Sequence, residues 1–218
     1  MVKVGVCLAG CGVNDGSEVH ESVITLLALD RAGVKVICFA PDRKQYHVVN
    51  HNTSGSMSEE RNVLIESARI SRGNILNIKN VSANDLDAII FPGGFGAALN
   101  LCNFGLEREN CTADPEVNRL ILEMHAANKP IGAICIAPAL IARVLGKKKI
   151  ILTIGTDEET AEKIELMGAV HKVCKVNDIV VDQDNKIVST PAYMLANRIS
   201  EAAAGIEKLV NKIVELAS

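Results

Sequence analysis

The sequence predicts an α/β fold in which a mostly parallel β-sheet is covered by helices on both faces. Short apolar runs rich in Val and Ile alternate with longer amphipathic segments, which is the pattern of repeated strand–helix–strand units. The apolar runs show little alternation with polar residues, as expected for strands buried on both faces. Two of these runs end in unusual turns, one rich in glycine and one carrying a cysteine. Functional sites in such sheets lie at the carboxyl ends of the strands.

The predicted strands are short and bounded by Gly, Pro, Asn or Asp. They are Lys3–Leu8, Val34–Ala40, Ala88–Phe91, Ile131–Ile134 and Lys149–Thr153, with shorter edge strands at Tyr46–Val49 and Asn77–Val81. Ile179–Val181 and Lys186–Ser189 flank the polar turn Asp182–Asn185, which indicates a hairpin.

The helix boundaries follow from capping residues and helix breakers. Asp15–Glu18 resembles a capping signal for a helix that ends near Ala32, where Gly33 follows. Pro115 suits the first turn of a helix to Asn128, and Thr156–Glu159 reads as a capping box. The other expected helices are Arg61–Ser71, Ala137–Leu145 and Met194–Leu216, and the expected polar connections are His51–Glu60 and Asn100–Asp114.

Length and composition favour one domain over residues 1–218, since no Pro/Ser-rich linker and no internal repeat divides the chain. An apolar content of 48% supports a full core, and a net charge of -3 argues against a nucleic-acid partner. No apolar run is long enough to span a bilayer, so no membrane partner is expected.

The cysteines indicate a reducing compartment. Seven cysteines is an odd number, none forms a Cys-x-x-Cys pair, and the chain begins with a strand-like run without a signal peptide. We therefore expect free thiols and a cytoplasmic location. The five histidines are scattered over unrelated elements, so neither a metal site nor a metal cofactor is expected.

Cys135 stands apart from the other cysteines because it lies on a sharp turn between a predicted strand and a predicted helix. This is the arrangement of a nucleophile elbow, in which a strained turn lifts a side chain above the sheet. Helix N-terminal N–H groups favour a thiolate, so we expect the pKa of Cys135 to be lowered. The alternative is a buried cysteine that acts as a small hydrophobic residue, the ordinary fate of a free cysteine.

A second candidate element is the turn Pro92–Gly94, which follows the strand Ala88–Phe91. The backbone N–H groups at Gly93 and Gly94, together with that of Ile136, are candidate donors to an oxyanion. Asn100 follows this turn and could contact a ligand or serve as a turn or cap residue. Both turns lie at carboxyl strand ends, so they are expected to share one pocket.

The chain resembles the ThiJ/PfpI superfamily, and within it most closely the ElbB type, also described as enhancing lycopene biosynthesis or sigma cross-reacting proteins. The resemblance rests on Gly10–Val13, Arg61–Ile70, Phe91–Ala97, Cys135–Pro138 and Ser189–Met194. It implies the class I glutamine amidotransferase-like, flavodoxin-like fold, a three-layer sandwich. It also implies a homo-oligomer, expected to be a dimer, and relatives in eukaryotic mitochondria.

The superfamily keeps a glutamate in its first helix, hydrogen-bonded to the elbow cysteine, and Glu21 occupies that position. The chain departs from better-understood relatives in its histidines. Protease-like relatives place a histidine directly after the nucleophile, where this chain has Ile136. Amidotransferases need a later His-x-Glu, but His171 is the only histidine after Cys135.

No histidine is therefore expected as the general base. His20 neighbours Glu21 but points about 100° away around the helix. Because two anions in contact repel, a Glu21 carboxyl beside a Cys135 thiolate is expected to hold the proton.

Two functions of different classes fit these residues. The first is a cofactor-independent glyoxalase: Cys135 adds to the aldehyde of methylglyoxal or glyoxal, Glu21 moves a proton between adjacent carbons, and a hydroxy acid is released. The second is a non-enzymatic, redox-responsive or regulatory protein that influences isoprenoid biosynthesis, with Cys135 as the sensor. An assay with methylglyoxal and a Cys135→Ser control separates the two.

Overall fold

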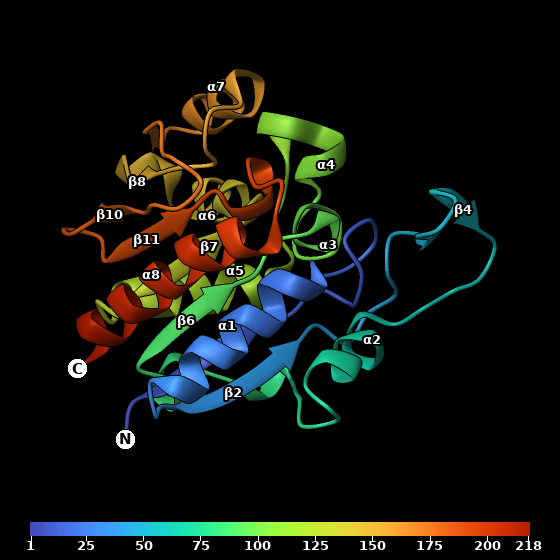
Figure 1. Ribbon diagram of the computed structural model, residues 1–218, viewed down its shortest axis with the longest axis horizontal. Helices are drawn as coiled ribbons and strands as arrows, with labels where there is room; N and C mark the ends of the chain where they lie inside the picture. Colours follow the sequence, from blue (N-terminus) through green and yellow to red (C-terminus); the bar gives the residue numbers. More distant parts are fainter.

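A computed structural model describes residues 1–218, and its centre is a seven-stranded sheet (Figure 1). Neighbouring strands are parallel except for one antiparallel pair at an edge, so the predicted α/β fold is confirmed. In spatial order the strands are β10 (Val180–Asp182), β11 (Ile187–Thr190), β7 (Ile131–Ile134), β6 (Ala88–Phe91), β1 (Lys3–Cys7), β2 (Lys35–Ala40) and β5 (Leu76–Asn77).

Helices cover both faces of this sheet. Those on one face are α1 (Val19–Arg31), α2 (Val63–Ile70) and α8 (Ile199–Ala217), of which α1 and α8 lie side by side in front of the sheet in Figure 1. Those on the other face are α3 (Phe95–Leu99), α5 (Pro115–Ala126) and α6 (Ala137–Leu145). Two further helices, α4 (Phe104–Glu107) and α7 (Glu158–Leu166), stand close together at one edge of the molecule.

Each face of the sheet has its own apolar cluster, one beneath α5 and α6 and the other beneath α1 and α8. Every residue of β6 and β7 is buried, which is why these strands read as continuous apolar runs. Burying an aliphatic side chain such as Ile89 stabilises the fold by about 1.5–3 kcal/mol. The two central strands are thus fixed between the two layers, and the turns that carry Gly93, Gly94 and Cys135 follow directly from their ends.

The short strands at the margins differ from the prediction in extent and in pairing. Val48–Asn50 (β3) does form a strand, but it pairs with Gly55–Met57 (β4) in a separate hairpin that projects from the body of the molecule (Figure 1). Beyond β5, Ile78–Asn80 forms a 3-10 turn, since the Asn77 side chain accepts the Lys79 N–H. Ile151–Leu152 (β8) pairs with Val170–His171 (β9), outside the main sheet.

The expected polar connection Asn100–Asp114 is also different from the prediction. It contains α4 and a 3-10 turn at Arg108–Asn110, and it buries Leu101, Phe104 and Cys111 in the core. These few apolar side chains organise a segment whose composition is otherwise polar.

Two helix starts differ from the prediction as well. Asp157 caps α7, because its side chain accepts the Thr160 N–H. The last helix begins at Ile199, since Ala192–Met194 forms a 3-10 turn. None of the helices combines the length and the apolar character that crossing a membrane requires.

Candidate active site

Cys135 lies in the turn between β7 and α6 with a backbone φ of 62°. This left-handed conformation costs a non-glycine residue about 1–3 kcal/mol and persists where the surroundings enforce it. The Cys135 N–H donates to the Thr190 carbonyl of β11 at 3.0 Å, which fixes the turn against the neighbouring strand. The predicted strained elbow is confirmed, and only 8% of the cysteine is exposed.

Glu21 reaches the cysteine from the first turn of α1 and is fully buried. Its two carboxyl oxygens accept backbone N–H groups, Oε2 from Gly93 at 2.9 Å and Oε1 from Tyr193 at 3.2 Å. The carboxyl lies beside the Cys135 side chain, close enough that each group shifts the pKa of the other. Segments after β6, β7 and β11 therefore converge on one glutamate beside Cys135, and a hydrogen bond from the Cys135 sulfur to Glu21 stays a prediction.

The site keeps Glu21 protonated near neutral pH. Burial raises the pKa of Glu21 from 4.5 to about 8, and the negative charge of Glu18 adds to the effect. The hydrogen bonds from the Tyr193 and Gly93 backbone and from Cys135 oppose it. A carboxyl with a pKa of about 8 can take up and release a proton at physiological pH, which suits general acid–base chemistry.

The pKa of the Cys135 thiol is raised well above its ordinary value, first by burial and then by the charge of Glu21. The N–H groups of Gly94 and Ile136 donate toward the sulfur and lower the pKa, but they do not outweigh burial. The expectation of a lowered thiol pKa is therefore wrong for the free protein. Formation of the thiolate requires a base, and Glu21 is the group in contact.

The glycine turn after β6 lets Cys135 and Glu21 approach each other and supplies backbone N–H donors. The Gly93 N–H is used by Glu21, whereas Gly94 and Ile136 line the pocket and direct their N–H groups to the sulfur. A Cβ at Gly93 would lie 2.5 Å from Cys135 Cβ and 2.7 Å from Glu21 Oε2. Only glycine at this position lets the two side chains meet.

Asn100 does not line the pocket. Its Nδ2 donates to the carbonyls of Ala9 and Asp15 at 2.8 and 2.9 Å, and its Oδ1 accepts the Tyr46 N–H at 2.9 Å. The side chain is buried and its hydrogen bonds hold three loop segments together. Of the two roles considered for Asn100, the structure places it in the turn-stabilising one.

A pocket of about 360 Å³ opens next to Cys135. It is lined by Val13, Glu18, Gly94, Phe95, Ala98, Phe104, Gly105, Arg108, Cys135, Ile136, Thr160, Tyr193 and Met194. Sequence reasoning did not assign Glu18, Arg108 or Tyr193 to the site. Glu18 is the N-cap of α1, and its side chain accepts the Glu21 N–H at 2.6 Å.

Tyr193 links the pocket to a histidine. Its hydroxyl is hydrogen-bonded to Nδ1 of His20 at 2.8 Å, and its pKa is raised by burial and by the charges of Glu18 and Glu21, so the hydroxyl keeps its proton. His20 does point away from Glu21, as the helix geometry predicts. The signal that could have revealed Tyr193 is its place just after a predicted strand, at the same sheet edge as Cys135.

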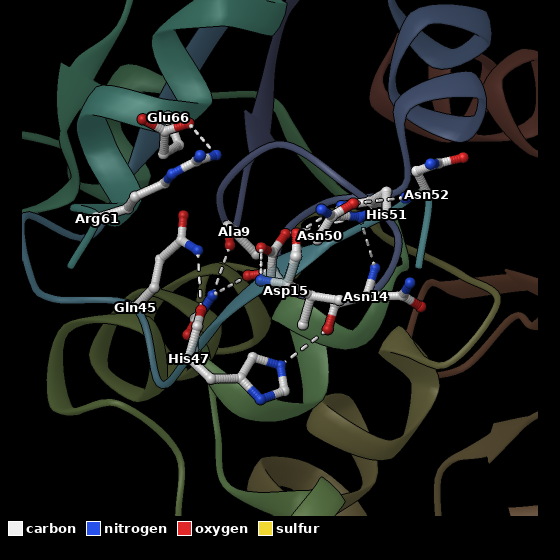
Figure 2. A network of polar contacts seen from close by, with 12 residues as sticks. Ala9, Asn14, Asp15, Gln45, His47, Asn50, His51, Asn52, Arg61 and Glu66 are labelled. Carbon is white, nitrogen blue, oxygen red and sulfur yellow. Dashed lines mark hydrogen bonds and ion pairs between the residues drawn. The ribbon is translucent and has the colours of Figure 1, made fainter. Parts of the chain in front are cut away.

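A second polar cluster, which we call the Asp15 cluster, joins the loop after β1 to the segment before β4 (Figure 2). Buried Asp15 accepts the Val49 N–H at 2.8 Å, and His51 lies 3.7 Å from its other oxygen. His47 is hydrogen-bonded to the Asn14 carbonyl at 2.9 Å. These histidines do not line the pocket beside Cys135, and no three His, Cys, Asp or Glu side chains gather as metal ligands would.

No family model matches the chain, but individual proteins match it along nearly its whole length. It is 46% identical to the ES1 protein homolog, mitochondrial, of Rattus norvegicus, over 98% of this chain and 84% of that protein. The human glutamine amidotransferase-like class 1 domain-containing protein 3, mitochondrial, is also 46% identical, over 98% of this chain and 83% of its own length.

Solved structures agree with these relatives. The crystal structure of an isoprenoid biosynthesis protein with amidotransferase-like domain from Ehrlichia chaffeensis superposes with a TM-score of 0.94 at 37% identity, each chain covered completely. Schizosaccharomyces pombe DJ-1 has a TM-score of 0.58 at 20% identity, over 99% of this chain and 96% of that one, which shows a shared fold. With relatives that match nearly its whole length at 46% identity, the chain belongs to the ES1 family of glutamine amidotransferase-like proteins.

Proposed function

We propose that this protein converts small 2-oxoaldehydes, such as methylglyoxal and glyoxal, to 2-hydroxy acids without a cofactor. The observation that carries the proposal is the contact between the Cys135 thiol and the Glu21 carboxyl at the wall of a pocket. The pKa of Glu21, about 8, makes this carboxyl a base and an acid near neutral pH.

The first step is addition of the thiol to the aldehyde. Deprotonated Glu21 takes the thiol proton while the sulfur bonds to the aldehyde carbon, and the carbonyl electron pair moves to the oxygen. That oxygen then accepts the proton, which gives a hemithioacetal. The N–H groups of Gly94 and Ile136, which face the sulfur, are close to the developing oxyanion.

The second step moves hydrogen between the two carbons without net oxidation. Glu21 removes the proton from the former aldehyde carbon, and the electron pair forms an enediol as the neighbouring carbonyl oxygen is protonated. Glu21 returns a proton to the second carbon, and the hydroxyl on the first carbon gives its proton back to the group that protonated the neighbouring oxygen, so that the first carbon becomes a thioester carbonyl. Water then cleaves the thioester to a 2-hydroxy acid and restores the thiol.

Tyr193 is a second proton donor, which the sequence analysis did not identify. Tyr193 lines the pocket and its hydroxyl is hydrogen-bonded to His20, so a proton given to a substrate oxygen can be replaced through the histidine. Two proton-handling groups, Glu21 and Tyr193, then share the steps.

The sensor function is less well supported, because sensor cysteines ionise easily and are accessible. Cys135 is buried and its pKa is raised. Glutamine hydrolysis also lacks its histidine: His171, the only one after Cys135, is hydrogen-bonded to the Ile154 N–H at 3.3 Å.

The test is conversion of methylglyoxal by the purified full-length chain, followed as lactate formation without added cofactor. Turnover is expected for the wild type and its loss for Cys135→Ser. Equal turnover by both proteins would overturn the proposal. Rapid peroxide oxidation of Cys135 without any turnover would support the sensor instead.

A further inference from the structure

We infer that the pocket takes carbonyl compounds with an apolar body and an anionic end, larger than methylglyoxal, and that Arg108 binds the anion. The inference rests on the proposed function in one respect: the carbonyl end is placed at Cys135. The remaining argument uses the size, the walls and the charges of the pocket.

The pocket is larger than methylglyoxal alone would fill. A liquid water molecule takes about 30 Å³, so a volume of about 360 Å³ holds roughly a dozen groups of that size. Methylglyoxal has only five non-hydrogen atoms. The volume falls within the range of sites that enclose larger organic ligands.

The walls of the pocket are apolar. Val13, Phe95, Phe104 and Met194 come from four different segments and face the same space. Phe95 is 53% exposed and Val13 is 39% exposed, so apolar surface continues to the rim of the pocket. An exposed phenylalanine beside a pocket is typical of a surface that an apolar ligand covers.

Arg108 is a cation without a partner at this pocket. It lies at the end of α4, its side chain is exposed, and it belongs to none of the ion pairs or side-chain hydrogen bonds of the chain. Its backbone has a φ of 49° and a ψ of −129°, a strained conformation of the kind that collects at functional sites. A free guanidinium in this place can bind a carboxylate or phosphate through two parallel hydrogen bonds.

The charges around the pocket orient such a ligand. Glu18 and Glu21 lie together at the start of α1, and Glu18 lines the pocket with its negative charge, so an anionic group is disfavoured at the reactive end. Arg108 stands on a different segment and pairs with neither carboxylate. The anionic end therefore lies at Arg108, the carbonyl at the cysteine, and the apolar body between them.

The experiment measures binding to the full-length protein without turnover. The probes are octanoate, octyl phosphate, neutral octanamide and acetate, each titrated by calorimetry. Alkylation of Cys135 by iodoacetamide is followed in parallel by peptide mass spectrometry. The variant is Arg108→Met, with Arg108→Lys retaining the charge. Arg72→Met is the matched control, because Arg72 is also exposed at positive φ (56°) but lies outside the pocket.

We expect octanoate or octyl phosphate to bind at least tenfold more tightly than octanamide and acetate, and to slow alkylation of Cys135. The stronger of the two identifies the anion as carboxylate or phosphate. Arg108→Met should bring the affinity down to that of octanamide, whereas Arg108→Lys and Arg72→Met should retain the preference.

Three results would overturn the inference: equal affinity for octanoate, octyl phosphate, octanamide and acetate; equal loss of affinity in Arg72→Met and Arg108→Met; or binding that leaves the alkylation of Cys135 unchanged. Because binding is measured without turnover, these results are distinct from failure of the methylglyoxal assay, which concerns the proposed reaction alone.

Discussion

Two loops of this protein carry a cysteine beside carboxylates at the carboxyl end of a sheet strand, and they differ in every other respect. Cys11 follows β1 and is partly exposed, near Glu66, Asp15, Arg61 and Arg69. Cys135 follows β7, is buried, and faces a pocket.

The backbone distinguishes them further. In the first loop the positive φ angles fall on Gly10 and Gly12, at 109° and 135°, which glycine adopts without strain. In the elbow the positive φ falls on Cys135 itself. A strand end and nearby charges are thus common to both loops, whereas a strained cysteine, a buried carboxyl beside it and a pocket occur together only at Cys135.

The largest expected effect separates the two cysteines by activity. Cys135→Ser should lower kcat for methylglyoxal by roughly a thousandfold or more, because the covalent intermediate cannot form. Cys11→Ser should retain at least half of the activity. Steady-state kinetics of the two variants measure the contrast, and a comparable loss in Cys11→Ser would make the first loop part of the site.

The next effect compares two of the buried glutamates, Glu21 beside Cys135 and Glu66 near Cys11. Since Glu21 must be deprotonated to take the thiol proton, kcat/KM of the wild type should rise with pH and level off above its pKa of about 8. Glu21→Gln should lose roughly 10²- to 10⁴-fold and the pH-dependent rise with it. Glu66→Gln should keep the rise, and a pH-independent wild type would show that Glu21 is not the base.

The same glutamate should leave a signature in stability. Its pKa is about 8 in the folded chain and near 4.5 in the unfolded one, so between these pH values the folded state holds a proton that the unfolded state releases. The free energy of unfolding should therefore fall as pH rises through this window, by a few kcal/mol on the order of the shift. Urea denaturation at pH 5 and pH 8.5 should show a smaller fall in the free energy of unfolding for Glu21→Gln than for the wild type. Equal falls in the two proteins would mean that a group other than Glu21 titrates.

A methyl group at Gly93 should move the Cys135 and Glu21 side chains apart. Gly93→Ala places its Cβ between Cys135 and Glu21, and a displacement of about 1 Å costs on the order of a hundredfold in rate. Gly33→Ala is the control, because its φ of 67° is also positive but no atom lies within 4 Å of the added Cβ. It should cost about 1 kcal/mol of stability, seen as a lower melting temperature, and no activity.

The smallest effect is the order in which the thiols react in the resting protein. With iodoacetamide at pH 7, Cys11 should be alkylated several times faster than Cys135, because it is the only cysteine that is not buried. Peptide mass spectrometry over time gives both rates. Faster reaction at Cys135 would mean that its thiol is ionised at rest, contrary to the effect of burial.

The sequence was sufficient for the parts of the fold that burial dictates. Continuous apolar runs predicted β1, β6 and β7, and the turn after β7 predicted the strain at Cys135. Glu21 was placed through the family resemblance, because nothing local distinguishes it from a solvated helix residue.

Contacts between distant segments account for what was missed. Tyr193 contacts Glu21 across 172 positions, and His20 reaches the pocket only through that tyrosine. Arg108 lies in a segment that reads as polar, and its position depends on buried Phe104 and Cys111. The pKa of Cys135 depends on burial by several elements, so the helix N-terminus alone predicted its direction wrongly.

The left-handed backbone of Cys135 also bears on how the sequence can change over generations. Glycine would occupy this conformation with about 1–3 kcal/mol less strain, and asparagine also tolerates it better than most residues. If the thiol ceased to matter in some lineage, a substitution of Cys135 by glycine would tend to be retained, because it would stabilise the fold. The residue at this one position in a related protein therefore indicates whether natural selection still maintains the thiol.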